Sequence, residues 1–231
     1  MDFKSVSELK EKSSLLKVRD VELLSSQKKG YIGKNVFKVT LEDGSERYAE
    51  QILKNGRDGD AVVIIPITEE GKFVMVVQSR PNTLGGVLVE FPAGMVDEGE
   101  DALTSARREL LEETGYLSEN IRELEWHYQD QGCSRAIVRT FIAEDCRKVS
   151  DIHLDDFEKL EPVVMSYEDI ESLMHGDSDF GVNDANSKLA FYEYTYRRKW
   201  LWKIIKIEIE KNQFLLILIF KDHVIINVIS V

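Results

Sequence analysis

The sequence contains only two cysteines, Cys133 and Cys146, among its 231 residues. Two cysteines provide neither a disulfide framework nor a zinc-binding pattern, so we expect a protein of the reducing cytoplasm. Long apolar runs are also missing, because no stretch reaches the ~20 apolar residues that a membrane-spanning helix needs. The N-terminal residues lack the apolar segment of a secretory signal peptide. We therefore expect neither secretion nor insertion into a membrane.

Basic residues are in deficit, with 30 Lys and Arg against 42 Asp and Glu, which gives a formal net charge of −12 at pH 7. Such a protein repels nucleic acids and anionic membrane surfaces, so we expect neither as a partner. If its ligand is itself an anion, bound metal ions and a few arginines must supply positive charge at the site. The hydrophobic fraction of 43% is ample for a core, and the length suits one domain with extensions.

What the sequence does contain is a glycine-rich turn that runs into an acidic helix, between residues 94 and 116. Gly94 and Gly99 permit the backbone angles of a sharp bend before the helix begins. Apolar residues then recur at helical spacing from Asp101, and Gly115 follows the last turn as a stop signal. Negative charge near the first turn suits the helix dipole, and three acidic residues lie there: Asp97, Glu98 and Glu100.

Three carboxylates crowd the second half of this helix. At about 100° per residue, Glu109 and Glu113 lie on nearly the same side, Glu112 lies on their flank, and Glu113 falls close to the apolar stripe. Crowded carboxylates repel one another and lose hydration against a packed face. A hard divalent cation such as Mg²⁺ removes both penalties, and Arg108 can hold Glu112 by an ion pair one turn away. The alternative is a solvated acidic helix face, which is common in a protein this negative.

The full spacing favours the cation site over the solvated face. The stretch resembles the Nudix box, the signature of Nudix hydrolases, with Tyr in a last place that is normally aliphatic. The matching residues are Gly94, Glu100, Arg108, Glu109, Leu110, Glu112, Glu113, Gly115 and Tyr116. The resemblance implies a loop–helix–loop that binds Mg²⁺ or Mn²⁺ and hydrolyses a diphosphate joined to a nucleoside.

The order of strands, loop and helix predicts an α/β fold, here a Nudix-type α/β/α sandwich with a mixed sheet. Apolar or alternating patterns predict strands at residues 61–67, 72–78, 88–91, 124–128, 136–143 and 162–166. Helices are expected at 167–174 and from about 185 to 198, with a polar connection over 144–160.

We expect the chain to divide into an N-terminal extension (1–57) that makes dimer and substrate contacts, the Nudix domain (58–198) and a C-terminal tail (199–231) of unknown role. A helix start is predicted near residues 5–8 and a β-hairpin over 31–53. A lone hairpin is not stable, so it must pack on the domain or on a second subunit, and the resemblance implies a homodimer. Three β-prone runs in the tail predict extra strands or an association surface: 204–209, 214–220 and 224–231.

Two segments outside the box resemble the ADP-ribose pyrophosphatase branch of the family: Gln78-Ser79-Arg80 and Glu90-Phe91-Pro92-Ala93-Gly94. The resemblance implies metal ligation by the Ala93 carbonyl and by Glu109, Glu112 and Glu113. It also implies that Arg80 contacts a phosphate, a task that suits a guanidinium. Arg108 and Glu112 are the catalytic candidates on the helix, and the substrate-binding candidates besides Arg80 are Glu90, Gly132 and Ser134.

The attacking water needs a general base, which the resemblance places on the acidic loop before the last strand. We choose Glu158, with Asp155 and Asp156 as alternates and His153 as a weaker one. The resemblance implies cleavage of a nucleoside diphosphate sugar, foremost ADP-ribose, into AMP and ribose 5-phosphate. One departure leaves other substrates open, since Gln131-Gly132-Cys133-Ser134 lacks the Pro of a Pro-Gly segment typical of that branch. The alternatives are hydrolysis of GDP-sugars or other nucleoside diphosphate derivatives, and a sensor that binds ADP-ribose without cleaving it.

Overall fold

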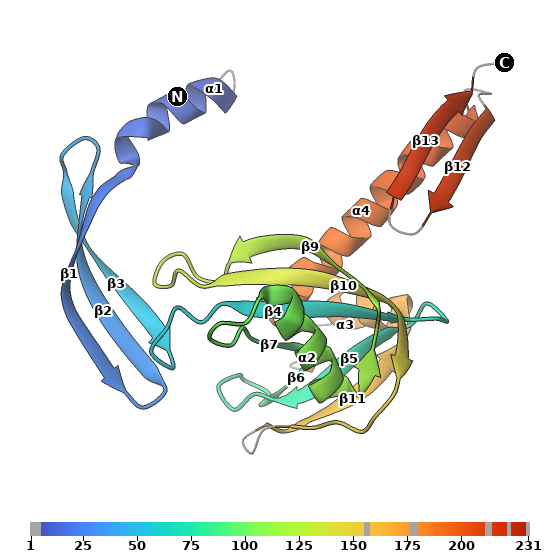
Figure 1. Cartoon of the computed structure of the whole chain (residues 1–231), viewed down its shortest axis with the longest axis horizontal. Coiled ribbons are helices and arrows are strands. Elements are labelled where there is room, and N and C mark those ends of the chain that lie inside the picture. The colour runs from blue at the N-terminus through green and yellow to red at the C-terminus, as the bar shows by residue number, and fades with distance from the viewer. Residues whose placement is uncertain (1–5, 155–157, 176–179, 211–213, 221–222, 230–231) are drawn as a thin grey trace.

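The computed structural model describes residues 6–154, 158–175, 180–210, 214–220 and 223–229. The N-terminal extension begins with helix α1 (Val6–Ser13) and a 3₁₀ turn (Ser14–Leu16), followed by a three-stranded antiparallel sheet of β1 (Val18–Lys29), β2 (Ile32–Leu41) and β3 (Glu46–Lys54). This sheet stands to one side of the rest of the molecule (Figure 1). The predicted helix start and the hairpin of β2 and β3 are confirmed.

Strand β1 is absent from the predictions made from the sequence. All of its residues are exposed, so the strand carries no clear alternation of buried and solvated side chains from which it could be recognised. What holds it is backbone pairing with β2, which runs from Val18 opposite Leu41 to Lys29 opposite Ile32 with two register shifts. The extension is therefore a sheet of three strands, and not a lone hairpin.

The domain that follows is built on a mixed eight-stranded sheet. Its strands are β4 (Ala61–Thr68), β5 (Phe73–Ser79), β6 (Val87–Glu90), β7 (Ala93–Met95), β8 (Tyr116–Leu117), β9 (Asn120–Tyr128), β10 (Ile137–Lys148) and β11 (Leu160–Met165). The main order is β11-β5-β4-β10-β8, with β6 paired to β5, β7 to β4 and β9 to β10. The central pair β4 and β10 is parallel, whereas the other pairings are antiparallel.

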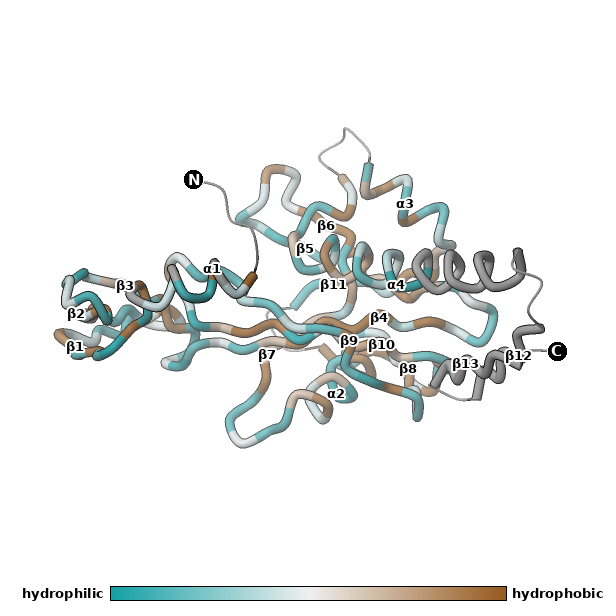
Figure 2. Tube along the Cα trace, turned by 90° about the horizontal axis from the view of Figure 1, so that it is seen from above, coloured by the Kyte–Doolittle hydropathy of each residue, from teal (hydrophilic) through white to brown (hydrophobic). Residues whose placement is uncertain are grey.

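Helices cover both faces of this sheet, as a sandwich requires. Helix α2 (Ala102–Thr114) lies on one face, and α3 (Tyr167–His175) and the first part of α4 (Ala185–Glu210) lie on the other (Figure 2). The predicted α/β/α sandwich with a mixed sheet is confirmed. Successive residues of β4 point to opposite faces, and both sets are buried: Val63 and Ile65 belong to one core cluster, and Val62 and Ile64 to the other.

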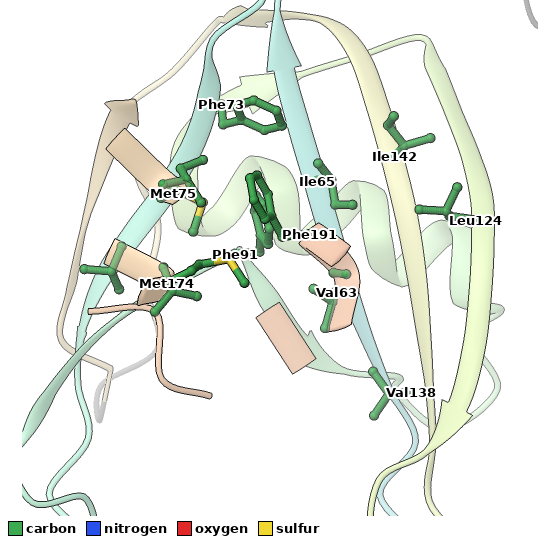
Figure 3. Packing of buried hydrophobic residues seen from close by; sticks show 14 residues of the cluster. Val63, Ile65, Phe73, Met75, Phe91, Leu124, Val138, Ile142, Met174 and Phe191 are labelled. Atoms are coloured by element: carbon green, nitrogen blue, oxygen red, sulfur yellow. The ribbon is translucent and has the colours of Figure 1, made fainter. Parts of the chain in front are cut away.

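The larger core lies between the sheet and helices α3 and α4. Phe73, Phe91 and Phe191 meet there with Met75 and Met174 (Figure 3). Phe73 makes an edge-on contact with Phe191, with ring centroids 6.1 Å apart, a geometry that aromatic quadrupoles favour. The smaller core lies beneath α2 and includes Ala106 and Leu110, two members of the predicted apolar stripe. The apolar face of α2 packs on the sheet, and it lies next to the side of the helix that carries the carboxylates.

Two sequence predictions need correction at the end of this domain. Residues 144–148 continue β10 to Lys148, whereas the sequence predicts a polar connection there. Residues 204–209 are helical, because α4 extends to Glu210, and the predicted strand there is wrong. No glycine or proline interrupts residues 185–210, so nothing stops a helix once it has begun. Strands β12 (Phe214–Phe220) and β13 (His223–Ile229) do form, as an antiparallel pair. Among the described residues, no helix has the length and apolar character to cross a membrane.

Candidate active site

Helix α2 is held at both ends by specific contacts. At its start, the Asp101 carboxylate accepts hydrogen bonds from the backbone N–H groups of Leu103 (3.0 Å) and Thr104 (3.1 Å). At its end, Gly115 has a left-handed φ of 72°, and an added Cβ would overlap the backbone oxygen of Ser150. These contacts fix the rotation of the helix about its axis, and with it the direction of the carboxylates.

Glu113 and Glu109 face strand β7 from this helix. Glu113 is 1% exposed, and its Oε2 accepts a hydrogen bond of 2.9 Å from the N–H of Ala93. A Cβ added to Gly94 would overlap the carboxylate of Glu109. Gly94 does not have a positive φ, although Gly99 does at 82°. The expectation that Gly94 supplies a bend is therefore wrong, because its missing side chain instead makes room for Glu109.

Arg108 binds the remaining carboxylates of the box. Its guanidinium lies 2.7 Å from Glu109 and 3.1 Å from each of Glu112 and Glu100, and it also donates to the carbonyl oxygen of Met95 at 3.2 Å. The predicted pairing of Arg108 with Glu112 is confirmed. Partial burial alone would lower the pKa of Arg108, but the carboxylates around it outweigh burial and raise that pKa.

Burial makes the two inner glutamates weak acids. It raises the pKa of Glu109 to about 7, although Arg108 opposes the shift. It raises the pKa of Glu113 to about 8, against the opposing hydrogen bond from Ala93. The negative charge of Glu158 contributes to both increases, which places Glu158 near this pair. Buried carboxylates that repel one another need either protons or a cation.

A divalent cation fits the chemistry of these donors, since carboxylate and carbonyl oxygens are the ligands of Mg²⁺. Because Gly94 has no side chain, the Glu109 carboxylate fits against the β7 backbone, next to Ala93, which is hydrogen-bonded to Glu113. Within the described part of the chain, no three acidic, histidine or cysteine side chains already converge as a set of ligands. Glu109 and Glu112 are turned toward Arg108 instead, so a cation would compete with that guanidinium for them.

A second charged pair joins Arg80, which directly follows β5, to Glu90, the last residue of the neighbouring strand β6. The Arg80 Nε lies 3.1 Å from each Glu90 oxygen, and its Nη2 lies 2.6 Å from Oε2. Glu90 is buried, whereas the Arg80 side chain is 42% exposed. Both were predicted to bind substrate. The structure places Glu90 in the interior, where it holds the guanidinium of the partly exposed Arg80. Burial lowers the pKa of Arg80, but the hydrogen bonds and charge of Glu90 outweigh burial, and the negative charges of Glu113 and Asp184 add to the increase in that pKa.

The remaining predicted site residues lie in two loops. Gly132 and Ser134 belong to a turn organised by Asp130, whose Oδ1 accepts from the N–H of Gly132 at 3.1 Å and whose backbone oxygen accepts from the N–H of Ser134 at 2.7 Å. This turn lies against the extension, because the N–H of Ile52 donates to Cys133 O at 2.7 Å. The exposed His153 donates its backbone N–H to Glu112 O at 2.8 Å and thereby caps α2. Asp155 and Asp156 lie outside the described residues.

Comparison with known proteins agrees with this arrangement. The family described as the NUDIX domain matches residues 57–183, which is more than half of the chain. This protein belongs to the Nudix family. The resemblance predicted from residues 94–116 is thus confirmed, and the matched segment begins just after β3 and carries every glutamate of the site. Nudix hydrolases generally depend on divalent metal ions.

Several Nudix relatives are known by activity. An ADP-ribose pyrophosphatase of Bacillus subtilis is 36% identical over 137 residues, covering 59% of this chain and 71% of its own. An ADP-ribose pyrophosphatase of Saccharomyces cerevisiae is 32% identical over 141 residues, covering 56% and 60%. A GDP-mannose pyrophosphatase of Yersinia pestis is 27% identical over 145 residues, covering 59% and 71%.

Among solved structures, a crystal structure of an ADP compounds hydrolase superposes with a TM-score of 0.63 at 21% identity. The match covers 81% of this chain and 94% of the other. At this identity the likeness shows the shared fold. Because the coverage exceeds the matched NUDIX segment, the shared fold extends beyond residues 57–183.

Proposed function

We propose that this protein is a divalent-cation-dependent hydrolase that cleaves the diphosphate of a nucleoside diphosphate sugar, with ADP-ribose as the favoured substrate. AMP and ribose 5-phosphate would be the products. The observation that carries the proposal is the pair of buried carboxylates, Glu109 and Glu113, held against the Ala93–Gly94 backbone. The ADP-ribose pyrophosphatases among the relatives support the choice of substrate.

The residues that would hold the cation are Ala93 through its carbonyl, together with Glu109, Glu112 and Glu113. Mg²⁺ is the expected ion, with Mn²⁺ as a substitute, and when bound it supplies positive charge for the diphosphate. Arg80, anchored by Glu90 and half exposed, orients a phosphoryl group by two-point hydrogen bonding. The negative charge of Glu158 acts on both Glu109 and Glu113. Glu158 is therefore our choice for the general base that takes the proton of the attacking water. Arg108 keeps Glu112 in position through its ion pair.

The first test is a panel of substrates incubated with Mg²⁺: ADP-ribose, ADP-glucose, GDP-mannose and an oxidised nucleoside triphosphate. The nucleoside monophosphate released is measured directly by chromatography, because an added phosphatase would also attack the intact triphosphate. We expect the highest kcat/KM for ADP-ribose and no release after chelation of divalent ions. If every compound is returned intact with Mg²⁺ present, the proposed hydrolysis is wrong, and ADP-ribose binding without cleavage would then favour a sensor.

A GDP-sugar is the second candidate substrate. It is favoured by the GDP-mannose pyrophosphatase among the relatives and by the missing Pro in the turn that carries Gly132 and Ser134. In the panel, a higher kcat/KM for GDP-mannose than for ADP-ribose would select it. Both substrates share the diphosphate, so the roles proposed for Arg80 and the box glutamates hold for either.

We also propose that the protein is a homodimer in the cytoplasm. The extension sheet exposes apolar side chains on both sides of its strands, among them Leu23 (54%), Ile32 (52%) and Tyr48 (77%). Covering one such residue stabilises by about 1.5–3 kcal/mol, and a second copy of the extension offers the same surfaces. Sedimentation of the chain with and without residues 1–57 tests the dimer.

Both cysteines are free, which supports a reducing compartment.

A further inference from the structure

The chain changes its neighbour in the sheet between β6 and β7. Glu90, the last residue of β6, pairs with β5, whereas Ala93, the first residue of β7, pairs with β4. Only Phe91 and Pro92 separate the two strands. Proline has no N–H group, so the path of the chain through this crossing depends on the N–H groups of Phe91 and Ala93.

The backbone groups of Ala93 point away from β4. Ile64 of β4 donates its N–H to Pro92 O at 2.9 Å, one position before Ala93. Hydrogen-bonded and non-hydrogen-bonded pairs alternate along an antiparallel ladder, so Ala93 occupies a non-hydrogen-bonded position opposite Val63. Its N–H and C=O are therefore both directed outward from β4, where the N–H meets Glu113 of α2 and the carbonyl is proposed to bind a cation.

Ser187 of α4 binds Phe91 from the other face of the sheet. Its hydroxyl oxygen accepts a hydrogen bond of 2.9 Å from the N–H of Phe91. Ser187 is 1% exposed and Phe91 is 0% exposed, so water does not reach this N–H in place of the hydroxyl. The side chains of Phe91 and of Phe191, one turn after Ser187, both belong to the larger core (Figure 3). Helix α4 thus holds Phe91 by its backbone as well as by its side chain.

The start of α4 is itself fixed against β6. The Asp184 Oδ1 accepts from the N–H of Ser187 at 2.7 Å, as the side chain of an N-cap residue does. Just before the helix, Gly181 O accepts from the N–H of Val89 at 3.1 Å. Val89 and Phe91 are two residues apart, so their N–H groups leave β6 on the same side. Both are bonded to the segment that begins α4, which therefore covers this edge of β6.

We infer that Ser187 is a positioning residue for the cation site, because by holding the N–H of Phe91 it sets the direction of the Ala93 carbonyl. The crossing between β6 and β7 is then held from both faces of the sheet, by Ser187 of α4 and by Glu113 of α2. Pro92 between the two bonded residues has a fixed φ, so a shift of Phe91 is passed on to Ala93. The inference rests on the proposed function and deepens it.

The test compares Ser187→Ala with the unaltered chain, first in the absence of substrate. The affinity for Mn²⁺, used in place of Mg²⁺, is measured by electron paramagnetic resonance of the free ion. We expect Ser187→Ala to bind Mn²⁺ about tenfold more weakly, the lower end of the cost of losing a group that supports a metal ligand. Ser187→Thr keeps the hydroxyl and should stay within about threefold of the unaltered chain.

Turnover of ADP-ribose gives a second measurement. The Mg²⁺ concentration at half-maximal rate should rise about tenfold in Ser187→Ala. KM for ADP-ribose at saturating Mg²⁺ should stay within about threefold, because Ser187 is placed to act on the cation site and not on the substrate. A purely structural role for Ser187 would lower the melting temperature without changing either the affinity for Mn²⁺ or the Mg²⁺ requirement.

The matched control is Ser118→Ala. Ser118 is 2% exposed, and its hydroxyl oxygen accepts from the N–H of Asn120 at 3.0 Å, so this substitution removes an equivalent buried hydrogen bond. Ser118 lies between β8 and β9, which pair with β10, whereas β7 pairs with β4. Both alanine variants should melt at a lower temperature than the unaltered chain, and only Ser187→Ala should bind Mn²⁺ more weakly. If Ser187→Ala does not fold, Ser187→Cys replaces it, because a thiol is a weak acceptor.

Three outcomes overturn the inference: Mn²⁺ binding by Ser187→Ala as tight as that of Ser118→Ala, Ser187→Thr binding as weakly as Ser187→Ala, or no Mn²⁺ binding by the unaltered chain. Failure of the proposed hydrolysis is distinguishable from these. In that case the unaltered chain would bind Mn²⁺ and lose affinity on Ser187→Ala, while cleaving none of the diphosphates offered. Normal cleavage of ADP-ribose with unchanged Mn²⁺ affinity in Ser187→Ala would instead leave the hydrolase intact and remove Ser187 from the support of its cation site.

Discussion

Gly94 and Glu109 are in contact across the space between β7 and α2, so that any side chain at position 94 would overlap the Glu109 carboxylate. This contact explains why a glycine stands here when the backbone has no positive φ. It also means that the strand and the helix share one constraint. A change in β7 is transmitted directly to a carboxylate proposed to hold the cation.

Gly94→Ala is expected to reduce turnover about 10- to 100-fold, the cost typical of displacing a group that orients a metal ligand. The added methyl group must push Glu109 toward Arg108, away from Glu113 and the Ala93 backbone. The measurements are kcat at saturating ADP-ribose and the Mg²⁺ concentration at half-maximal rate. Gly99→Ala is the control, because nothing lies within 4 Å of a Cβ at Gly99, and its strain is confined to the backbone. Equal turnover by Gly94→Ala and the unaltered enzyme would contradict the role given to this contact.

Glu113→Gln should lose at least about 100-fold in turnover, beyond the cost of disturbing a supporting group, and yet remain folded. The amide oxygen can still accept the hydrogen bond from Ala93, so the packing of the helix is kept. Burial of a neutral amide also avoids the desolvation that raises the pKa of Glu113 to about 8. Melting in the absence of divalent ions should therefore occur at an equal or higher temperature than for the unaltered chain.

Glu119→Gln provides the matched control for that substitution, because Glu119 is exposed just after the helix. It should change neither turnover nor melting. Glu113 would have to be removed from the proposed cation site if Glu113→Gln turned over as fast as Glu119→Gln.

The sequence predicted those features that depend on residues close together along the chain. Residues 94–116 place glycines, carboxylates and apolar positions within a few helical turns, so the spacing predicted both the helix and the burial of Glu113. Strands β4 and β5 were recognised because they are buried on both faces. The exposed strand β1 had no such signal, and the helical residues 204–209 carried a misleading β-prone composition.

Contacts between distant segments were not visible in the sequence. The Gly94–Glu109 and Arg80–Glu90 contacts depend on how the sheet places β6 and β7, and the spacing alone gave Gly94 a different role. The docking of Tyr31 on Met95 was also not visible in the sequence, because it joins residues 64 positions apart.

Glu90→Gln should raise KM for ADP-ribose by about tenfold through Arg80, since it removes the charged partner of a two-point pair. In Glu90→Gln the guanidinium keeps its charge, but the amide nitrogen cannot accept a hydrogen bond, so only one of the two contacts of 2.6 and 3.1 Å that fix its plane can remain. The effect should appear in KM more than in kcat, because Glu90 itself lies beneath the substrate site. Glu161→Gln, on an exposed position of β11, is the control. A tenfold fall in kcat with unchanged KM would instead place Glu90 among the groups that act in the chemical step.

The unfolding free energy of the metal-free protein should fall as the pH rises from about 5 to 8. The pKa values of Glu109 and Glu113 in the folded state are about 7 and about 8, above the value of 4.5 for a free glutamate. In this range the folded state holds protons that the unfolded state has released, so stability decreases with pH. Groups with lowered pKa values, such as Glu100 and Asp101, are ionised in both states here and do not oppose the trend.

Urea unfolding with a chelator at pH 5.5 and pH 8 measures this difference, and Glu113→Gln should reduce it. Added Mg²⁺ should stabilise the protein more at pH 8 than at pH 5.5, because cation and protons compete for the same carboxylates. Metal-free stability that stays constant or rises over this range would show that Glu109 and Glu113 are ionised without a cation. The repulsion between them would then be relieved by Arg108 alone, and burial of the two carboxylates would not require a bound cation.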